Sequence, residues 1–213
     1  MSVRAVGAFL VLAIAGAAGG YGISALQTDA PLTISMAAPV PAVSPSYPVN
    51  EYDVKPDPDL APLGTGLPLE TRVLKEGGFK VEVAGPAGWQ VNPLDGPGWN
   101  FAPKRSESNT YVLRVEVLAG TRSSVSAARA SRILRLESSE DDGNLEHLVI
   151  EETADDSFTA SYLQGGYQRV TTERFLSLGG STAYATVAVS GREVDRAGMT
   201  DLLERVSASL RKP

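Results

Sequence analysis

The sequence contains no cysteine and only one histidine, His147. The lack of cysteine excludes a disulfide framework, a thiol nucleophile, a cysteine-ligated metal and the lipidated cysteine of a lipoprotein. Because there is a single histidine, the commonest general acid and base of enzymes is nearly absent. No G-x-S-x-G turn supplies a serine nucleophile, and no G-x-x-x-x-G-K-S/T loop supplies a phosphate site. We therefore predict no catalytic residues, no cofactor and no metal site.

Positive charge is also scarce. The chain has 19 Lys and Arg residues against 25 Asp and Glu residues, which gives a net charge of −6. This balance argues against nucleic acid as a partner, because phosphate binding needs a basic surface. The one basic cluster, Arg129, Arg132 and Arg135, lies on a predicted helix. Charged side chains on a helix usually form a solvated face, and we interpret the cluster in that way.

The N-terminal region holds a long uncharged run, residues 5–26, between Arg4 and Asp29. As a helix this run is about 33 Å long, enough to cross a hydrocarbon core of about 30 Å. The length favours an uncleaved single-pass membrane anchor over residues 1–27, with the N-terminus cytoplasmic and the rest extracytoplasmic. The alternative is a cleaved secretory signal, because Ala13-Ile14-Ala15 provides a small-x-small cleavage site. Both interpretations place the rest of the chain outside the cytoplasm.

Proline is concentrated in residues 28–70. Each proline removes a backbone donor and fixes φ, and no helical or alternating apolar pattern continues through this region. We predict residues 28–70 as a disordered, extended linker, and residues 71–213 as the extracytoplasmic domain. The linker would hold the domain away from the membrane.

Apolar periodicity predicts an α+β domain. Residues 79–83 and 110–118 alternate as half-buried strands do, and Gly165-Gly166 has the composition of a tight hairpin turn. Residues 124–137 and 195–210 switch to helical spacing. Strands joined by hairpins predict an antiparallel sheet with helices packed on it.

The same features carry a family resemblance. A strand leads into the turn Gly85–Trp89, a helix precedes a hairpin-rich sheet, and the chain closes on the helix Gly198–Leu210. This order resembles the PsbP-like α/β/α sandwich superfamily, which includes mycobacterial LpqN-type extracytoplasmic proteins. The resemblance covers about residues 75–211 and implies that fold and an extracytoplasmic, often non-enzymatic role. It implies no binding residues, and the Ala-, Gly- and Arg-rich composition is similar to that of actinobacterial proteins.

Aromatic residues make up 7% of the chain and suggest one candidate surface. Trp99 follows Gly-Pro-Gly and precedes the basic pair Lys104-Arg105. We predict that Trp99, Phe101 and Arg105 form a surface for a peptide, a glycan or an apolar ligand.

The acidic segment 137–156 carries nine carboxylates and no Lys or Arg. It lacks the spacing of a calcium loop, and we interpret it as solvated. The pairs Glu151/Glu152 and Asp155/Asp156 are candidates for acid–base work, but neighbours on a regular strand point to opposite faces.

Three hypotheses for function follow. The first is a membrane-anchored, non-enzymatic binding or accessory domain of the bacterial cell envelope, with an unidentified protein or small-molecule partner. The second is a cleaved, secreted, carboxylate-dependent hydrolase. The third is a protein-interaction module of an envelope complex. A pocket between sheet and helix would favour a small-molecule ligand, and a flat polar surface would favour a protein partner.

Overall fold

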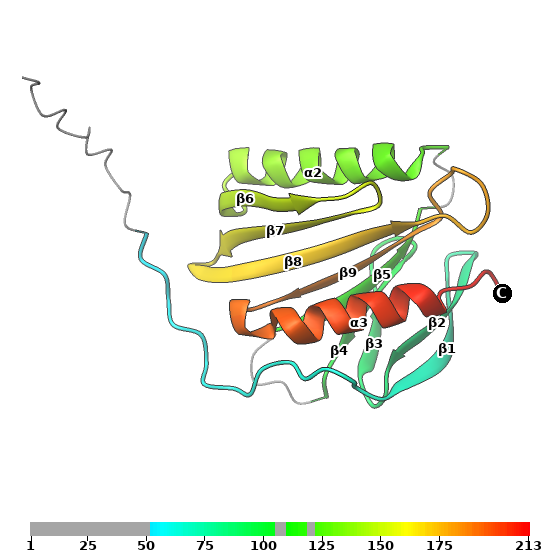
Figure 1. The fold of residues 1–213 in the computed structure, drawn as a ribbon, viewed down its shortest axis with the longest axis horizontal. Helices are drawn as coiled ribbons and strands as arrows, with labels where there is room; N and C mark the ends of the chain where they lie inside the picture. The colour runs from blue at the N-terminus through cyan, green and yellow to red at the C-terminus, as the bar shows by residue number, and fades with distance from the viewer. Residues whose placement is uncertain (1–51, 105–109, 119–121) are drawn as a thin grey trace, which may run out of the picture. The chain divides into compact units, whose positions relative to one another are not determined.

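A computed structural model describes residues 52–104, 110–118 and 122–213 (Figure 1). The predicted anchor, residues 5–26, lies outside the described residues, as does the linker up to residue 51. Within the described residues, no helix is both long enough and apolar enough to cross a membrane.

Seven antiparallel strands form the main sheet, in the order β3-β4-β5-β9-β8-β7-β6, and a separate hairpin pairs β1 with β2. The strands are β1 Leu69–Glu76, β2 Phe79–Pro86, β3 Gln90–Pro93, β4 Gly98–Ala102, β5 Val112–Val117, β6 Glu146–Thr153, β7 Ser157–Gln164, β8 Tyr167–Leu176 and β9 Ala185–Gly191. The helices are α2 Val125–Asp141, the short 3₁₀ helix η1 Glu193–Asp195, and α3 Arg196–Ser209. The predicted α+β class, a mostly antiparallel sheet with helices packed on it, is confirmed.

Local signals place several of these elements. The Ser124 side chain accepts a hydrogen bond from the Ala127 N–H and caps the start of α2. Gly165 and Gly166 turn β7 into β8 with φ values of 60° and 85°, which residues with a Cβ rarely adopt. The sequence patterns did not predict strands β1, β3 and β4. Strands β3 and β4 are short and lie among turn residues, and β1 has a single buried residue, Leu74, and so lacks clear alternation.

One face of the sheet carries the larger core. Leu113, Val115 and Val117 of β5 are buried on this face, beside the valines of β9. The apolar stripe of α3, which includes Met199 and Val206, packs against them, and so does the β1–β2 hairpin. Fully burying each Val, Leu or Met side chain contributes about 1.5–3 kcal/mol.

The opposite face carries a second core under α2. Alternation along β8 directs Val170 into the first core and Phe175 into the second. Phe175 stacks with Phe158 of β7, and Leu136 of α2 lies in the same cluster. Strands β6 to β9 thus lie between the two helices (Figure 1). Helix α2 contacts β6 and β8. On the same face of the sheet, β5 and β9 are therefore not covered by this core.

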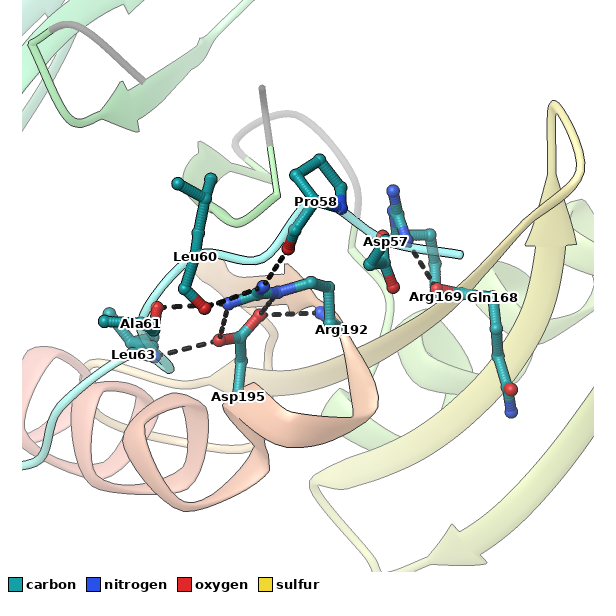
Figure 2. A network of polar contacts seen from close by, with 9 residues as sticks. All are labelled: Asp57, Pro58, Leu60, Ala61, Leu63, Gln168, Arg169, Arg192 and Asp195. Atoms are coloured by element: carbon teal, nitrogen blue, oxygen red, sulfur yellow. Dashed lines mark hydrogen bonds and ion pairs between the residues drawn. The ribbon is translucent and has the colours of Figure 1, made fainter. Parts of the chain in front are cut away.

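Residues 52–68 form an extended strap along the domain (Figure 2). The Lys55 N–H donates to the Gly166 carbonyl at 2.8 Å, and Leu63 is buried with 5% exposure. Helix α3 approaches the strap so closely that a Cβ on Gly198 would collide with the Leu63 carbonyl. Residues 52–68 therefore belong to the same compact unit as the sheet and the helices. Several backbone groups of the strap, including the Lys55 N–H, the Leu63 N–H and the Ala61 carbonyl, are hydrogen-bonded to the domain.

The strap is held by a buried ion pair, Arg192 with Asp195, whose side chains are 3% and 0% exposed. The Arg192 guanidinium donates to the carbonyls of Pro58, Leu60 and Ala61, each at 3.1 Å. Asp195 accepts the Leu63 N–H at 2.8 Å (Figure 2). Burial raises the pKa of Asp195, but hydrogen bonds from Arg192 and the Leu63 N–H outweigh burial and hold the pKa below its ordinary value.

Candidate functional site

The part of the sheet that α2 leaves uncovered opens into a cavity of about 490 Å³. We call it the α2 groove. Its charged and hydroxyl-bearing lining residues are Arg114, Glu116, Arg132, Arg135, Glu173 and Thr186. Ligand pockets in proteins typically measure about 300–1,000 Å³, so the groove has room for a small molecule.

Strand alternation creates this lining. Along β5, Leu113 and Val115 point into the first core, so Arg114 and Glu116 point to the α2 face. Thr186 of β9 is the register partner of Glu116 and therefore shares that face. From α2, Arg132 and Arg135 reach the groove from positions three residues apart, which lie on one side of a helix.

Arg132 and Glu173 form the fixed charges of the groove. The Arg132 Nε donates to both Glu173 oxygens at 3.0 and 3.1 Å, and its Nη2 lies 2.9 Å from Oε1. Glu173 is 2% exposed, and a carboxylate this deeply buried needs a cationic partner. Burial lowers the pKa of Arg132, but Glu173 outweighs burial and raises the pKa above its ordinary value. The two charges cancel, so this pair shapes the groove and adds no net charge.

The other charges of the groove are not neutralised in this way. Within the part of the chain that the structure describes, Arg114, Arg135 and Glu116 make no ion pair and no side-chain hydrogen bond. The Arg114 Nε and the Oδ1 of its cross-strand neighbour Asn100 are both buried without a partner. The groove therefore has two guanidinium groups and one carboxylate available for a ligand.

The structure overturns the predicted aromatic surface. Trp99 is 3% exposed and Phe101 is 0% exposed, and both lie in the first core. Both belong to β4, where positions two residues apart share a face, and the Phe101 ring lies directly against Gly85. The third residue, Arg105, lies outside the described residues. The two-residue spacing of Trp99 and Phe101 is typical of a strand, but the neighbouring Gly and Pro residues favoured a turn instead.

The acidic residues of β6 also differ from expectation. A register shift between Ile150 and Glu152 marks a bulge, and Glu151 and Glu152 line the same cavity beside α3. The interpretation that these neighbours face opposite ways was therefore wrong, because a bulge breaks strand alternation. Glu151 lies 2.8 Å from Arg196, and this partner holds the pKa of Glu151 below its ordinary value.

The rest of the acidic segment shows no convergent cluster. Asp156 lies near Arg174, with 3.6 Å between Oδ2 and Nε, and not with the glutamates of that cavity. Across the described ranges, no three His, Asp or Glu side chains are grouped as a metal ion requires.

The arginine cluster of α2 was interpreted as a solvated face, and this was wrong for Arg132. The signal that could have revealed its role is Glu173, which shares a strand face with the buried residues Thr171 and Phe175. A carboxylate in such a position requires a cation from another element. The spacing of the arginines along α2 does not indicate which of them supplies it.

Comparisons with known proteins add little to this site. No protein-family model matches the chain, and no curated protein matches it. A solved structure from Bacteroides thetaiotaomicron VPI-5482 is similar over 62% of this chain at 13% identity, with a TM-score of 0.38. The matched part is 45% of that protein, so the chain spans less than half of its length. Similarity at this level carries no argument about fold or function.

Proposed function

We propose that this chain is a membrane-anchored, extracytoplasmic, non-enzymatic binding domain of the bacterial cell envelope, and that the α2 groove is its ligand site. The predicted anchor over residues 5–26 and the proline-rich residues after it support the location. The element order supports a PsbP-like fold as part of the same proposal. The observation that carries the binding role is the pair of unpaired arginines, Arg114 and Arg135, in a cavity of ligand size.

The ligand of the α2 groove is a small acidic molecule. A guanidinium group presents planar donors that match carboxylate and phosphate oxygens. Arg132 is already occupied by Glu173, so Arg114 and Arg135 supply the attraction. Thr186 adds a hydroxyl that can donate or accept, and Phe175 and Leu118 supply apolar contact. This mixture of a few polar groups and apolar walls is typical of small-molecule sites.

A non-enzymatic role is supported by the state of two carboxylates that lie in cavities, Glu173 and Glu151. Glu173 is tied to Arg132, and Glu151 is tied to Arg196 with a lowered pKa. A general acid at neutral pH needs a raised pKa, which is the opposite of what Glu151 has. If a hydrolytic activity were found and lost on replacing Glu152 by Ala, the non-enzymatic proposal would be wrong.

The binding proposal is tested by calorimetry on the full chain in detergent micelles, with a panel of small carboxylates and phosphates. We expect at least one panel member to bind, and the double variant Arg114→Gln/Arg135→Gln to weaken its binding by about tenfold or more. Arg205→Gln is the matched control, because it removes an arginine charge from the surface of α3, away from the groove. Unchanged affinity in the double variant would exclude the α2 groove as the site.

A further inference from the structure

Two unpaired charges of opposite sign lie next to each other on one strand of the α2 groove. Arg114 and Glu116 of β5 are two residues apart, so both side chains lie on the same face. No ion pair joins them within the described residues, although each has a register partner on β9 that is uncharged: Ala188 for Arg114 and Thr186 for Glu116. The groove therefore presents a donor of hydrogen bonds and an acceptor side by side.

The surroundings of Glu116 distinguish its role from that of Glu173. Arg132 makes three contacts with the Glu173 carboxylate. Glu116 makes no such contact, and its negative charge acts on Arg132 only by electrostatic attraction, which helps to raise the pKa of that arginine. A ligand that carries only negative charge would meet repulsion from Glu116. A ligand that also carries an ammonium group would convert this repulsion into an attraction.

We propose that the α2 groove binds a short peptide with a free amino and a free carboxyl terminus. This inference rests on the function proposed above and names the class of its ligand. The peptide carboxylate lies at Arg114 with Arg135 nearby, its ammonium group lies at Glu116, and the apolar lining accepts its side chains.

The spacing of the two strand positions fits this class. Residues two apart on a strand have Cα atoms about 7 Å apart. The two ends of an extended dipeptide are also separated by roughly 7 Å. The two termini of a single amino acid are closer together than this, and the cavity of about 490 Å³ limits how long the peptide can be.

Three matched probes test the inference on the full chain in detergent micelles: dialanine, N-acetyl-dialanine and dialanine amide. They share one backbone and differ in which terminus is charged. We expect dialanine to bind about tenfold or more tightly than either blocked form, because each blocked form loses one charge-assisted contact. In Glu116→Gln, dialanine and N-acetyl-dialanine should bind equally. In Arg114→Gln, both should bind more weakly.

Failure of this inference differs from failure of the proposed function. If N-acetyl-dialanine binds the natural sequence as tightly as dialanine does, the proposal that the ligand needs both a free amino and a free carboxyl terminus is wrong. The proposal that the groove binds an acidic ligand then still stands. The same conclusion follows if simple carboxylates bind and dialanine does not. If no probe and no carboxylate or phosphate binds, both proposals are wrong. The comparison of probes on the natural sequence needs no variant, so a misfolded variant cannot decide the outcome.

Discussion

At the scale of residues, the Arg192–Asp195 pair has the largest predicted effect on stability. Its members are buried and together bind backbone groups of four strap residues: Pro58, Leu60, Ala61 and Leu63. A buried pair costs desolvation energy, and removing one member leaves the other charge unpaired in a medium of low polarity. The pair thus couples two segments that are far apart in the sequence.

We expect Asp195→Asn to lower the free energy of unfolding by about 3–5 kcal/mol, because the Arg192 charge stays buried without its partner. Urea unfolding followed by the fluorescence of the buried Trp89 and Trp99 measures this. Asp59→Asn is the control, since Asp59 is exposed and has no ion pair among the described residues. Equal losses in the two variants would contradict the role of the pair.

The same pair predicts a dependence of stability on pH. Because the folded pKa of Asp195 lies below its unfolded value of about 3.9, its contribution is fully present above that value. The contribution is lost as the pH falls through the lower, folded pKa. Unfolding measured between neutral and acidic pH should therefore show a weaker acid destabilisation in Asp195→Asn than in the natural sequence. A pH profile of the same steepness in both would count against this assignment.

Gly198 gives a second prediction at this scale. A Cβ at this position would overlap the Leu63 carbonyl, which cannot move without shifting the strap. We expect Gly198→Ala to destabilise the protein by about 1–3 kcal/mol, despite the higher helix propensity of alanine. Gly64→Ala is the matched control, because a Cβ there meets no atom within 4 Å. A melting temperature that rises in Gly198→Ala would show that the strap does not lie against α3.

At the scale of elements, we expect the strap to contribute to the stability of the domain. A chain starting at residue 69, where the first strand begins, would leave Arg192 without its carbonyl partners and remove Leu63 from the core. We expect it to be less stable than a chain starting at residue 51 by at least about 3 kcal/mol. Denaturant unfolding of the two chains measures the difference. Equal midpoints would restore the interpretation of residues 52–68 as a linker.

At the scale of the whole molecule, the predicted anchor leads to an expectation about membrane association. We expect the full chain to stay with membranes after a high-salt and alkaline wash, since residues 5–26 would be held by the hydrophobic effect and not by charge. Deleting residues 1–27 should release the protein. Intact-mass measurement separates the alternatives, because a cleaved signal would remove the first residues from the mature protein.

The sequence determined the class of fold and most of its elements, because alternation along β5 and the helical stripe of α3 are local patterns set by burial. It also placed the Gly165-Gly166 turn, whose conformation depends on neighbouring residues only. The tertiary structure alone decided which charges meet. Arg132 contacts Glu173, and Arg192 donates hydrogen bonds to the strap, although these partners are distant in the chain. The Nε of Arg114 is left buried without a partner. Side-chain periodicity carries no information about such partners.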